Sequence, residues 1–150
     1  MRIAILFLVT ANLIAAADIR VVVWDEQQPR QKQAYENFLG NAIADHLKTQ
    51  PGMKVRSVKQ DDPNKGIGPD VLDHCDVLIW WGHVAHGEVR DEVVGRVKKR
   101  VLEGMGLIAL HSAHYSKIFK SLMGTTCSLC WREAGEKERL WVCNPGHPIA

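Results

Sequence analysis

Two histidines and a serine directly follow an apolar run in the segment GLIALHSAHYS, residues 106–116. The first five residues have the length and bounds of a buried strand. Ligands in open α/β sheets bind outside the carboxyl ends of the strands, so His111, Ser112 and His114 are predicted to face a binding site. The alternative interpretation is that both histidines only hydrogen-bond nearby carbonyl groups at the end of the strand.

Two other apolar runs also end in ionisable residues. The β-branched run IRVVVW is followed by Asp25 and Glu26, and the run VLIWW is followed at a short distance by His83 and His86. Runs of this length and composition are typical of buried strands. Three strands that each end in ionisable groups favour one shared site at the same edge of a sheet.

The predicted catalytic residues are His83, His111 and His114, because imidazole suits proton transfer and, when neutral, metal binding. His83 and His111 are candidate ligands of a divalent metal such as Zn²⁺, with Asp25, Glu26 or Glu88 as a carboxylate ligand and a water in the open position. Such a metal would polarise a carbonyl group or activate water. Without a metal, the same imidazoles would act as general acid and base, and the residues leave both chemistries open.

Substrate binding is assigned to the polar and aromatic residues around these histidines. Asp25 and Glu26 would bind hydroxyl groups, and Trp81 at the rim would stack on a sugar ring. Ser112 is placed in the same group, because the sequence HSAH lacks the G-x-S-x-G elbow of a nucleophilic serine.

The elements that must position these residues alternate between strand and helix. Strands are predicted over residues 19–24, 53–58, 77–81 and 106–110, with a possible later strand over 138–142, and helices over 35–49, 90–103 and 116–123, with one helical turn over 69–72. This alternation predicts a mostly parallel sheet covered on both faces. In flavodoxin-like order the first strand lies beside the third and the third beside the fourth, which gathers the three polar strand ends at one edge.

Residues 1–17 have the pattern of a secretory signal peptide. Met1-Arg2 precedes an apolar run, and three alanines end it. Cleavage after Ala17 would leave residues 18–150 as the mature domain, periplasmic or secreted and no longer attached to a membrane. The alternative is an uncleaved membrane anchor.

Export would place the four cysteines in an oxidising compartment. Cys127 and Cys130 have C-x-x-C spacing, but their surroundings resemble a loop rather than the strand-to-helix setting of a redox motif. They are interpreted as ordinary buried or disulfide-linked cysteines, with a redox or zinc pair as the alternative. Cys75 and Cys143 are predicted to be small core residues.

Length and charge narrow the class of partner. A chain of 150 residues predicts a single domain, and a formal net charge of +2 is too small to indicate binding to nucleic acid or to an anionic membrane. No glycine-rich phosphate loop is present, so nucleotide binding is not predicted. A small molecule remains as the expected partner.

The chain resembles the ThuA-like family, named for trehalose utilisation. The resemblance rests on the runs VVVWDE, VLIWWGHVAHGEV, ALHSAHYSK, WREAGEKERLWV and NPGHPIA. It implies a flavodoxin-like three-layer sandwich similar to class I glutamine amidotransferases. It also implies a role in the metabolism of disaccharides or keto-sugars, and therefore a carbohydrate as the small-molecule partner.

Compared with the amidotransferase pattern G-x-C-x-G-H, this chain reads ALHSAH, so His111 stands in the place of the nucleophilic cysteine and His114 matches the following histidine. A glutaminase needs that thiolate to form its glutamyl thioester, so this activity is excluded. What the resemblance implies instead is an acid–base or metal site on an amidotransferase-like scaffold.

Members of this family run on to a late strand that ends in P-G-H-E, whereas this sequence stops at Ala150. The resemblance therefore predicts an incomplete domain with a partial site. It also predicts an uncovered sheet edge, through which a homo-oligomer could form.

The leading hypothesis is an exported protein of carbohydrate metabolism that uses a histidine-rich site at the carboxyl edge of its sheet. The alternatives are a non-catalytic sugar-binding module and a truncated, inactive copy.

Overall fold

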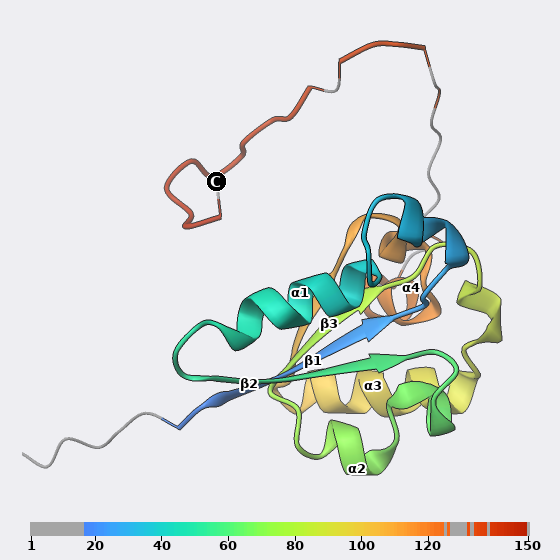
Figure 1. Cartoon of the computed structure of the whole chain (residues 1–150), viewed down its shortest axis with the longest axis vertical. Coiled ribbons are helices and arrows are strands. Elements are labelled where there is room, and N and C mark those ends of the chain that lie inside the picture. The colour runs from blue at the N-terminus through green and yellow to red at the C-terminus, as the bar shows by residue number, and fades with distance from the viewer. Residues whose placement is uncertain (1–16, 125, 127–131, 133, 138, 150) are drawn as a thin grey trace, which may run out of the picture.

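The computed structural model describes residues 17–124, 126, 132, 134–137 and 139–149. Its centre is a parallel sheet of four strands in the order β2-β1-β3-β4 (Figure 1). The strands are β1 (Ile19–Asp25), β2 (Met53–Lys59), β3 (Val77–Trp81) and β4 (Gly106–Ala109). This order confirms the predicted flavodoxin-like arrangement, in which the first strand pairs with the third and the third with the fourth.

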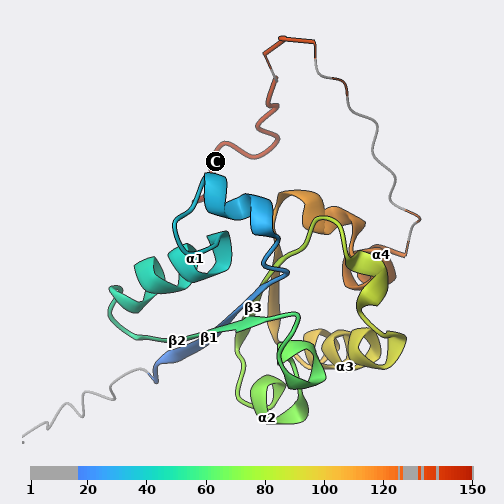
Figure 2. The ribbon, with the colours of Figure 1, turned by 45° about the vertical axis from the view of Figure 1, so that its right-hand side comes forward.

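In the described part of the chain, four α-helices and four short 3₁₀ helices accompany the sheet. The α-helices are α1 (Leu39–Lys48), α2 (Pro69–Leu72), α3 (Asp91–Leu102) and α4 (Lys117–Met123), and the 3₁₀ helices are η1 (Pro29–Gln33), η2 (Pro63–Gly66), η3 (His86–Glu88) and η4 (His111–Tyr115). The last two, η4 and α4, follow β4. Figure 2 shows α1 on one side of the strands and the other three α-helices on the opposite side. The chain therefore forms three layers, helix, sheet and helix, as predicted.

The core lies on both faces of β1, because alternate residues of a strand point to opposite sides. Val22 and Trp24 pack with α2, α3 and α4, whereas Val21 and Val23 pack against α1. Trp24 and Trp80 are paired across β1 and β3, and both are about 1% exposed. Their rings stack with centroids 4.0 Å apart. This aromatic pair lies directly beneath the carboxyl edge of the sheet.

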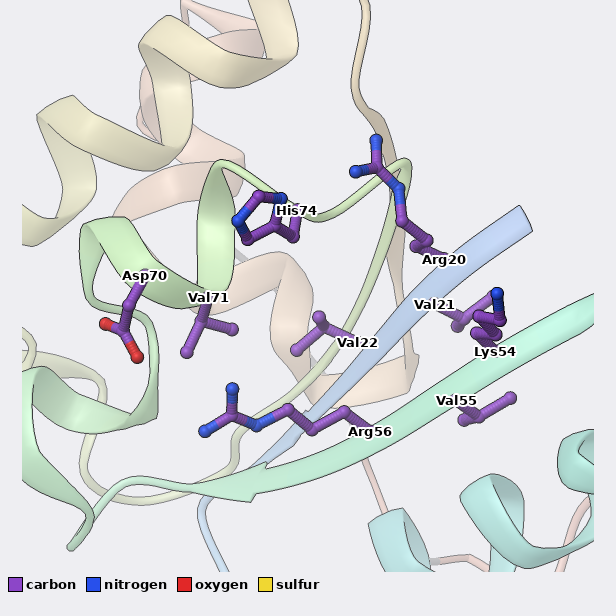
Figure 3. A pocket seen from close by; sticks show the side chains of 9 residues that line it. All are labelled: Arg20, Val21, Val22, Lys54, Val55, Arg56, Asp70, Val71 and His74. Carbon is purple, nitrogen blue, oxygen red and sulfur yellow. The ribbon is translucent and has the colours of Figure 1, made fainter. Parts of the chain in front are cut away.

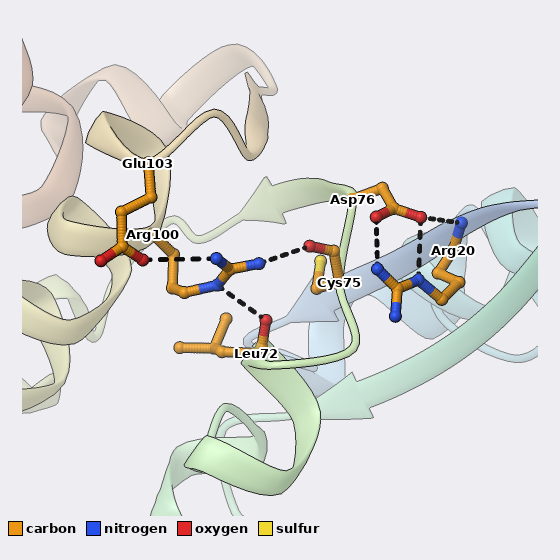
Figure 4. Close-up of polar contacts among 6 residues, drawn as sticks. All are labelled: Arg20, Leu72, Cys75, Asp76, Arg100 and Glu103. Atoms are coloured by element: carbon orange, nitrogen blue, oxygen red, sulfur yellow. Dashed lines mark hydrogen bonds and ion pairs between the residues drawn. The ribbon is translucent and has the colours of Figure 1, made fainter.

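Two arginines hold the amino end of the sheet together (Figure 4). Arg20 on β1 donates from its backbone N–H, Nε and Nη2 to the carboxylate of Asp76, which directly precedes β3. These hydrogen bonds hold the pKa of Asp76 well below its usual range. Arg100 on α3 donates to the carbonyl groups of Leu72 and Cys75. The turn that leads into β3 is therefore tied both to β1 and to α3.

Three predictions of local structure differ from what the structure shows. The first long helix begins at Leu39 rather than at Tyr35, because Phe38 has a left-handed φ of 62° that a helix cannot contain. None of the described residues 139–142 is in a strand, since this segment is exposed and pairs with no neighbour. Cys143 is exposed in the same segment, whereas Cys75 is buried as predicted.

Two other predictions fall outside the described residues. The predicted signal peptide would cover residues 1–17, of which only Ala17 is described, and Cys127 and Cys130 are not described. In the part of the chain that the structure describes, no helix has the length and apolar character needed to cross a membrane.

Candidate functional site

The carboxyl ends of β1, β3 and β4 lie side by side. In the parallel register Trp24 is opposite Trp80, and Trp80 is opposite Ala109. Just beyond, the N–H of Glu26 donates to the carbonyl of Trp81 at 3.2 Å. The structure therefore brings the three polar strand ends to one edge, as their strand order requires.

Asp25 is fully buried and its carboxylate binds the protein's own donors. Oδ1 accepts from the backbone N–H of Gln27 at 2.6 Å and from the side-chain amide of Gln31 at 3.0 Å, and Oδ2 accepts from the N–H of Gly40 at 2.6 Å. Gly40 lies in the first turn of α1, where a negative charge is favourable. Asp25 therefore fixes the start of α1 to the end of β1, and its oxygens are not free to bind a sugar hydroxyl.

Glu26 has a comparable role on the other side of β1. Its carboxylate accepts three successive backbone N–H groups, from His83 at 2.7 Å, Val84 at 3.0 Å and Ala85 at 2.9 Å. Gln28 donates its side-chain amide to the same carboxylate. Glu26 is only 6% exposed, so it orders the loop after β3 from below rather than facing a ligand.

His86 is at the centre of a group of cationic side chains. Burial lowers its pKa, the charge of Glu26 opposes this, and the nearby positive charges of His83, Lys120 and His114 lower it further. Electrostatic influence of this kind requires that these residues lie close to His86. His83 and His114 therefore belong to the electrostatic surroundings of His86.

Tyr115 completes this group at the end of η4. Its ring centroid lies 6.3 Å from that of His86 and 5.4 Å from that of His114, and the Lys120 ammonium lies 4.1 Å above the ring. We refer to His83, His86, His114, Tyr115 and Lys120 as the carboxyl-edge cluster.

The turn after β4 holds His114 in one tautomer. Its Nδ1 lies 2.8 Å from the carbonyl oxygen of His111. Because a carbonyl oxygen only accepts hydrogen bonds, Nδ1 must carry the proton and donate it. In the neutral ring Nε2 then keeps its lone pair, and this atom is buried without a hydrogen-bond partner among the described residues. An imidazole in this state can accept a proton.

His111 lies at the sharp turn between β4 and η4, with a left-handed φ of 44° and an exposed side chain. Residues other than glycine rarely adopt this conformation, and when they do they often lie at functional sites. A strained turn from strand to helix is also the geometry of a nucleophile elbow.

Ser112 connects two loops, whereas Trp81 is partly exposed at the end of β3. The Ser112 hydroxyl is buried and donates to the carbonyl of Gly82 at 2.9 Å, which ties the turn after β4 to the end of β3. Trp81 is half-buried, and its ring stacks on that of His83 with centroids 6.1 Å apart.

The described residues do not form a metal centre. Among them, no three His, Cys, Asp or Glu side chains lie together in a group that could hold an ion. A metal at His83 and His111 would need a carboxylate from Asp25 or Glu26, and the structure uses both carboxylates to bind backbone N–H groups.

Two cavities lie outside the carboxyl-edge cluster. One of about 250 Å³ lies along β1 and β2 and is lined by Arg20, Lys54 and Arg56 (Figure 3). The other, of about 310 Å³, lies where β2 ends and α1 begins, and its lining includes Asn37 and Asn41. The second cavity also includes Gln27, the residue directly after Glu26, so it belongs to the same edge of the sheet.

Sequence reasoning missed two members of the carboxyl-edge cluster, Tyr115 and Lys120, and placed His86 at the shared edge without giving it a role. His86 carried a signal, since it is three residues from His83 and at the end of the same strand. Tyr115 was visible only as the neighbour of His114. Lys120 gave no signal, because a lysine in a short helix is usually a solvated residue.

The fold and site together define an α/β protein with a flavodoxin-like strand order and a histidine-bearing turn at the position of a nucleophile elbow. The family model described as "ThuA: Trehalose utilisation" matches residues 20–150. The chain therefore belongs to the ThuA family, which relates it to the carbohydrate metabolism of trehalose utilisation. A search of curated proteins found no match.

Proposed function

We propose that this protein is exported and acts on a carbohydrate, a glycoside or a keto-sugar, by proton transfer at the carboxyl edge of its sheet. One observation carries the proposal: the exposed imidazole of His111 lies at a turn from strand to helix with a left-handed φ of 44°, a strained geometry that is typical of functional sites. The family adds the substrate class, because its description is trehalose utilisation.

In this proposal the histidines share the acid–base work. The exposed imidazoles of His83 and His111 supply and receive the protons, and His114 orients the turn through the hydrogen bond between its Nδ1 and the carbonyl of His111. Asp25 and Glu26 act by positioning, the first through α1 and the second through the loop that carries His83. An imidazole rather than a thiol at the turn supports acid–base chemistry over glutamine hydrolysis.

The neighbouring cavity supports a sugar as the ligand. It is lined by the amide side chains of Gln27, Asn37 and Asn41 beside the ring of Phe38. Amides can donate and accept hydrogen bonds with hydroxyl groups, and an aromatic ring provides an apolar surface. The Asn41 amide already donates to Asn37 and accepts from the Ser57 hydroxyl, so a sugar would bind to the polar groups that these hydrogen bonds leave free.

The proposal is tested by measuring turnover of a panel of disaccharides and keto-sugars by the wild type and by His111→Ala and His114→Ala. General acid–base catalysis contributes about 10²-fold or more, so each variant is expected to lose at least about that factor in kcat. His46→Ala is the matched control, because His46 is an exposed histidine on α1.

Unchanged turnover in both site variants would exclude this assignment. Sugar binding without turnover in the wild type, insensitive to His111→Ala, would instead identify a non-catalytic sugar-binding module. Metal analysis of the same purified samples, with and without chelator, shows whether an ion contributes to the activity.

Export is a separate part of the proposal, supported by the sequence pattern of residues 1–17. N-terminal sequencing of the protein from cell fractions is expected to find a chain that begins at Asp18 in the periplasm or the medium. A chain that keeps Met1 in the membrane or the cytoplasm would contradict export.

A further inference from the structure

The carboxyl-edge cluster contains a lysine whose charge is not neutralised by the described part of the protein. Lys120 on α4 is half-buried, and its ammonium lies over the ring of Tyr115. Lys117, one turn earlier on the same helix, forms an ion pair with Asp91 at 2.8 Å. Among the described residues no carboxylate forms an ion pair with Lys120.

The carboxylates that lie nearest to the cluster are used elsewhere. Glu26 accepts three backbone N–H groups, and Asp25 accepts the N–H of Gly40. Glu88 accepts the side-chain amide of Gln60 at 2.9 Å. Three backbone donors disperse much of a carboxylate's charge, so these groups do little to balance the cations that face outward.

Three side chains that can carry a positive charge gather around Tyr115. The Lys120 ammonium lies 4.1 Å from its ring centroid, and the rings of His86 and His114 lie 6.3 Å and 5.4 Å from it. Cations that are gathered on one surface without carboxylate partners repel one another, and an anion bound among them relieves that repulsion. Lysine and imidazolium donate charge-assisted hydrogen bonds to carboxylate and phosphate oxygens.

We propose that the carboxyl-edge cluster binds an anionic group of the substrate, a carboxylate or a phosphoryl group on a sugar, with Lys120 as its main charge partner. The inference rests on the proposed function and narrows it, since a neutral disaccharide would leave Lys120 without a partner. His86 lies on the same aromatic ring as Lys120, with its ring centroid 6.3 Å from that of Tyr115 and the Lys120 ammonium 4.1 Å from it.

The test compares matched neutral and charged sugars by calorimetric titration of the whole protein at low salt. One pair is methyl glucoside and methyl glucuronide, and the other is glucose and glucose 6-phosphate. A single partly exposed ion pair predicts that at least one charged sugar binds about fivefold more tightly than its neutral partner. The pair that shows the preference identifies the source of the charge, carboxylate or phosphoryl.

Three variants assign the preference to a residue. Lys120→Gln is expected to abolish it, Lys120→Arg to keep most of it, and Lys117→Gln to leave it unchanged, because Lys117 already has a carboxylate partner. Melting curves of each variant show whether it folds.

Equal affinity for the neutral and charged members of both pairs would overturn the inference and leave the proposed function in place. The same conclusion would follow if Lys117→Gln and Lys120→Gln reduced the preference alike. If the protein bound none of the four sugars and turned over no sugar of the wider panel, the proposed function would fail together with the inference.

Discussion

His111 combines a functional position with an unfavourable backbone. A φ of 44° brings the Cβ of an L-residue too close to the following carbonyl oxygen, at a cost of about 1–2 kcal/mol. Natural proteins keep such strain where the geometry is needed for function. The strain at His111 therefore supports its place in the site without any reference to the family.

This strain can be measured with a pair of substitutions. The free energy of unfolding of the His111→Gly variant is expected to be about 1 kcal/mol higher than that of the His111→Ala variant. The reason is that glycine adopts a positive φ without the Cβ clash. The measurement is urea unfolding of the two variants under the same conditions.

His114 provides the matched control, because its φ is not positive. There the order is expected to reverse, with His114→Gly about 0.5–1 kcal/mol less stable than His114→Ala. The same order at both positions would show that His111 is not strained.

The two carboxylates at the end of β1 show what residue types alone cannot predict. Asp25 and Glu26 were predicted to bind substrate hydroxyls because acidic residues at a strand's carboxyl end usually face a ligand. Whether a carboxylate faces outward depends on which N–H groups its own loops bring to it, and these loops lie 15 and 57–59 residues further along the chain. A sequence pattern read over a few neighbours does not contain that information.

At the scale of elements, α1 is held against β1 by an unusually close approach. A Cβ added to Gly40 would lie 2.5 Å from the Cβ of Asp25 and 2.8 Å from its Oδ2. Only glycine leaves room for the hydrogen bond between the Gly40 N–H and the Asp25 carboxylate. The start of α1 therefore depends on this residue for space rather than for backbone freedom.

Gly40→Ala is expected to destabilise the protein by about 1–3 kcal/mol, because the helix must move away from a fully buried carboxylate. Chemical unfolding measures the difference.

Gly95→Ala is the matched control, since Gly95 lies within α3 with no heavy atom within 4 Å of its added Cβ. This substitution is expected to stabilise the protein by about 0.5–1 kcal/mol through helix propensity. A loss of stability in Gly95→Ala equal to that in Gly40→Ala would contradict the steric explanation.

The elements themselves were largely predictable, because each carries its own periodic pattern. β3 and α2 have the predicted bounds, and α3 differs by one residue at each end. The 3₁₀ helices were missed, including η4, since a turn of five residues is too short to show a period. This limit matters for the site, because η4 carries the bond that sets the tautomer of His114.

At the scale of the whole molecule, burial of His86 makes stability depend on pH. Its pKa is lowered from the usual 6.5, chiefly by burial, so the unfolded chain binds a proton at a higher pH than the folded protein does. The stabilising contribution is therefore complete above about pH 6.5 and is lost as the pH falls through the folded pKa. The free energy of unfolding is expected to decrease as the pH falls from 7.5 to 5.

His86→Gln is expected to flatten this decrease, because the variant has no group to protonate at that position. Urea unfolding at several pH values measures both slopes. Gly95→Ala, which changes no ionisable group, is expected to shift the curve by a constant amount and keep the wild-type slope. If the free energy of unfolding of the His86→Gln variant fell with pH as steeply as that of the wild type, other groups would be the cause of the pH dependence.

The topology was predictable because alternation of strand and helix permits few parallel arrangements. The composition of the carboxyl-edge cluster was not, since Lys120 reaches His86 only after α4 has packed against α3. The residues at the strand ends could thus be predicted from the local sequence pattern. The side chains that surround them could not, because tertiary packing brings them there from other elements.

The stacked indole rings of Trp24 and Trp80 have an optical consequence. Two chromophores with centroids 4.0 Å apart, at an interplanar angle of 21°, couple their electronic transitions. The pair exists only while β1 and β3 keep their register, and it lies one residue below Asp25 and Trp81. Near-ultraviolet circular dichroism of these two tryptophans therefore provides an internal signal for the edge where ligands are expected to bind, without any added label.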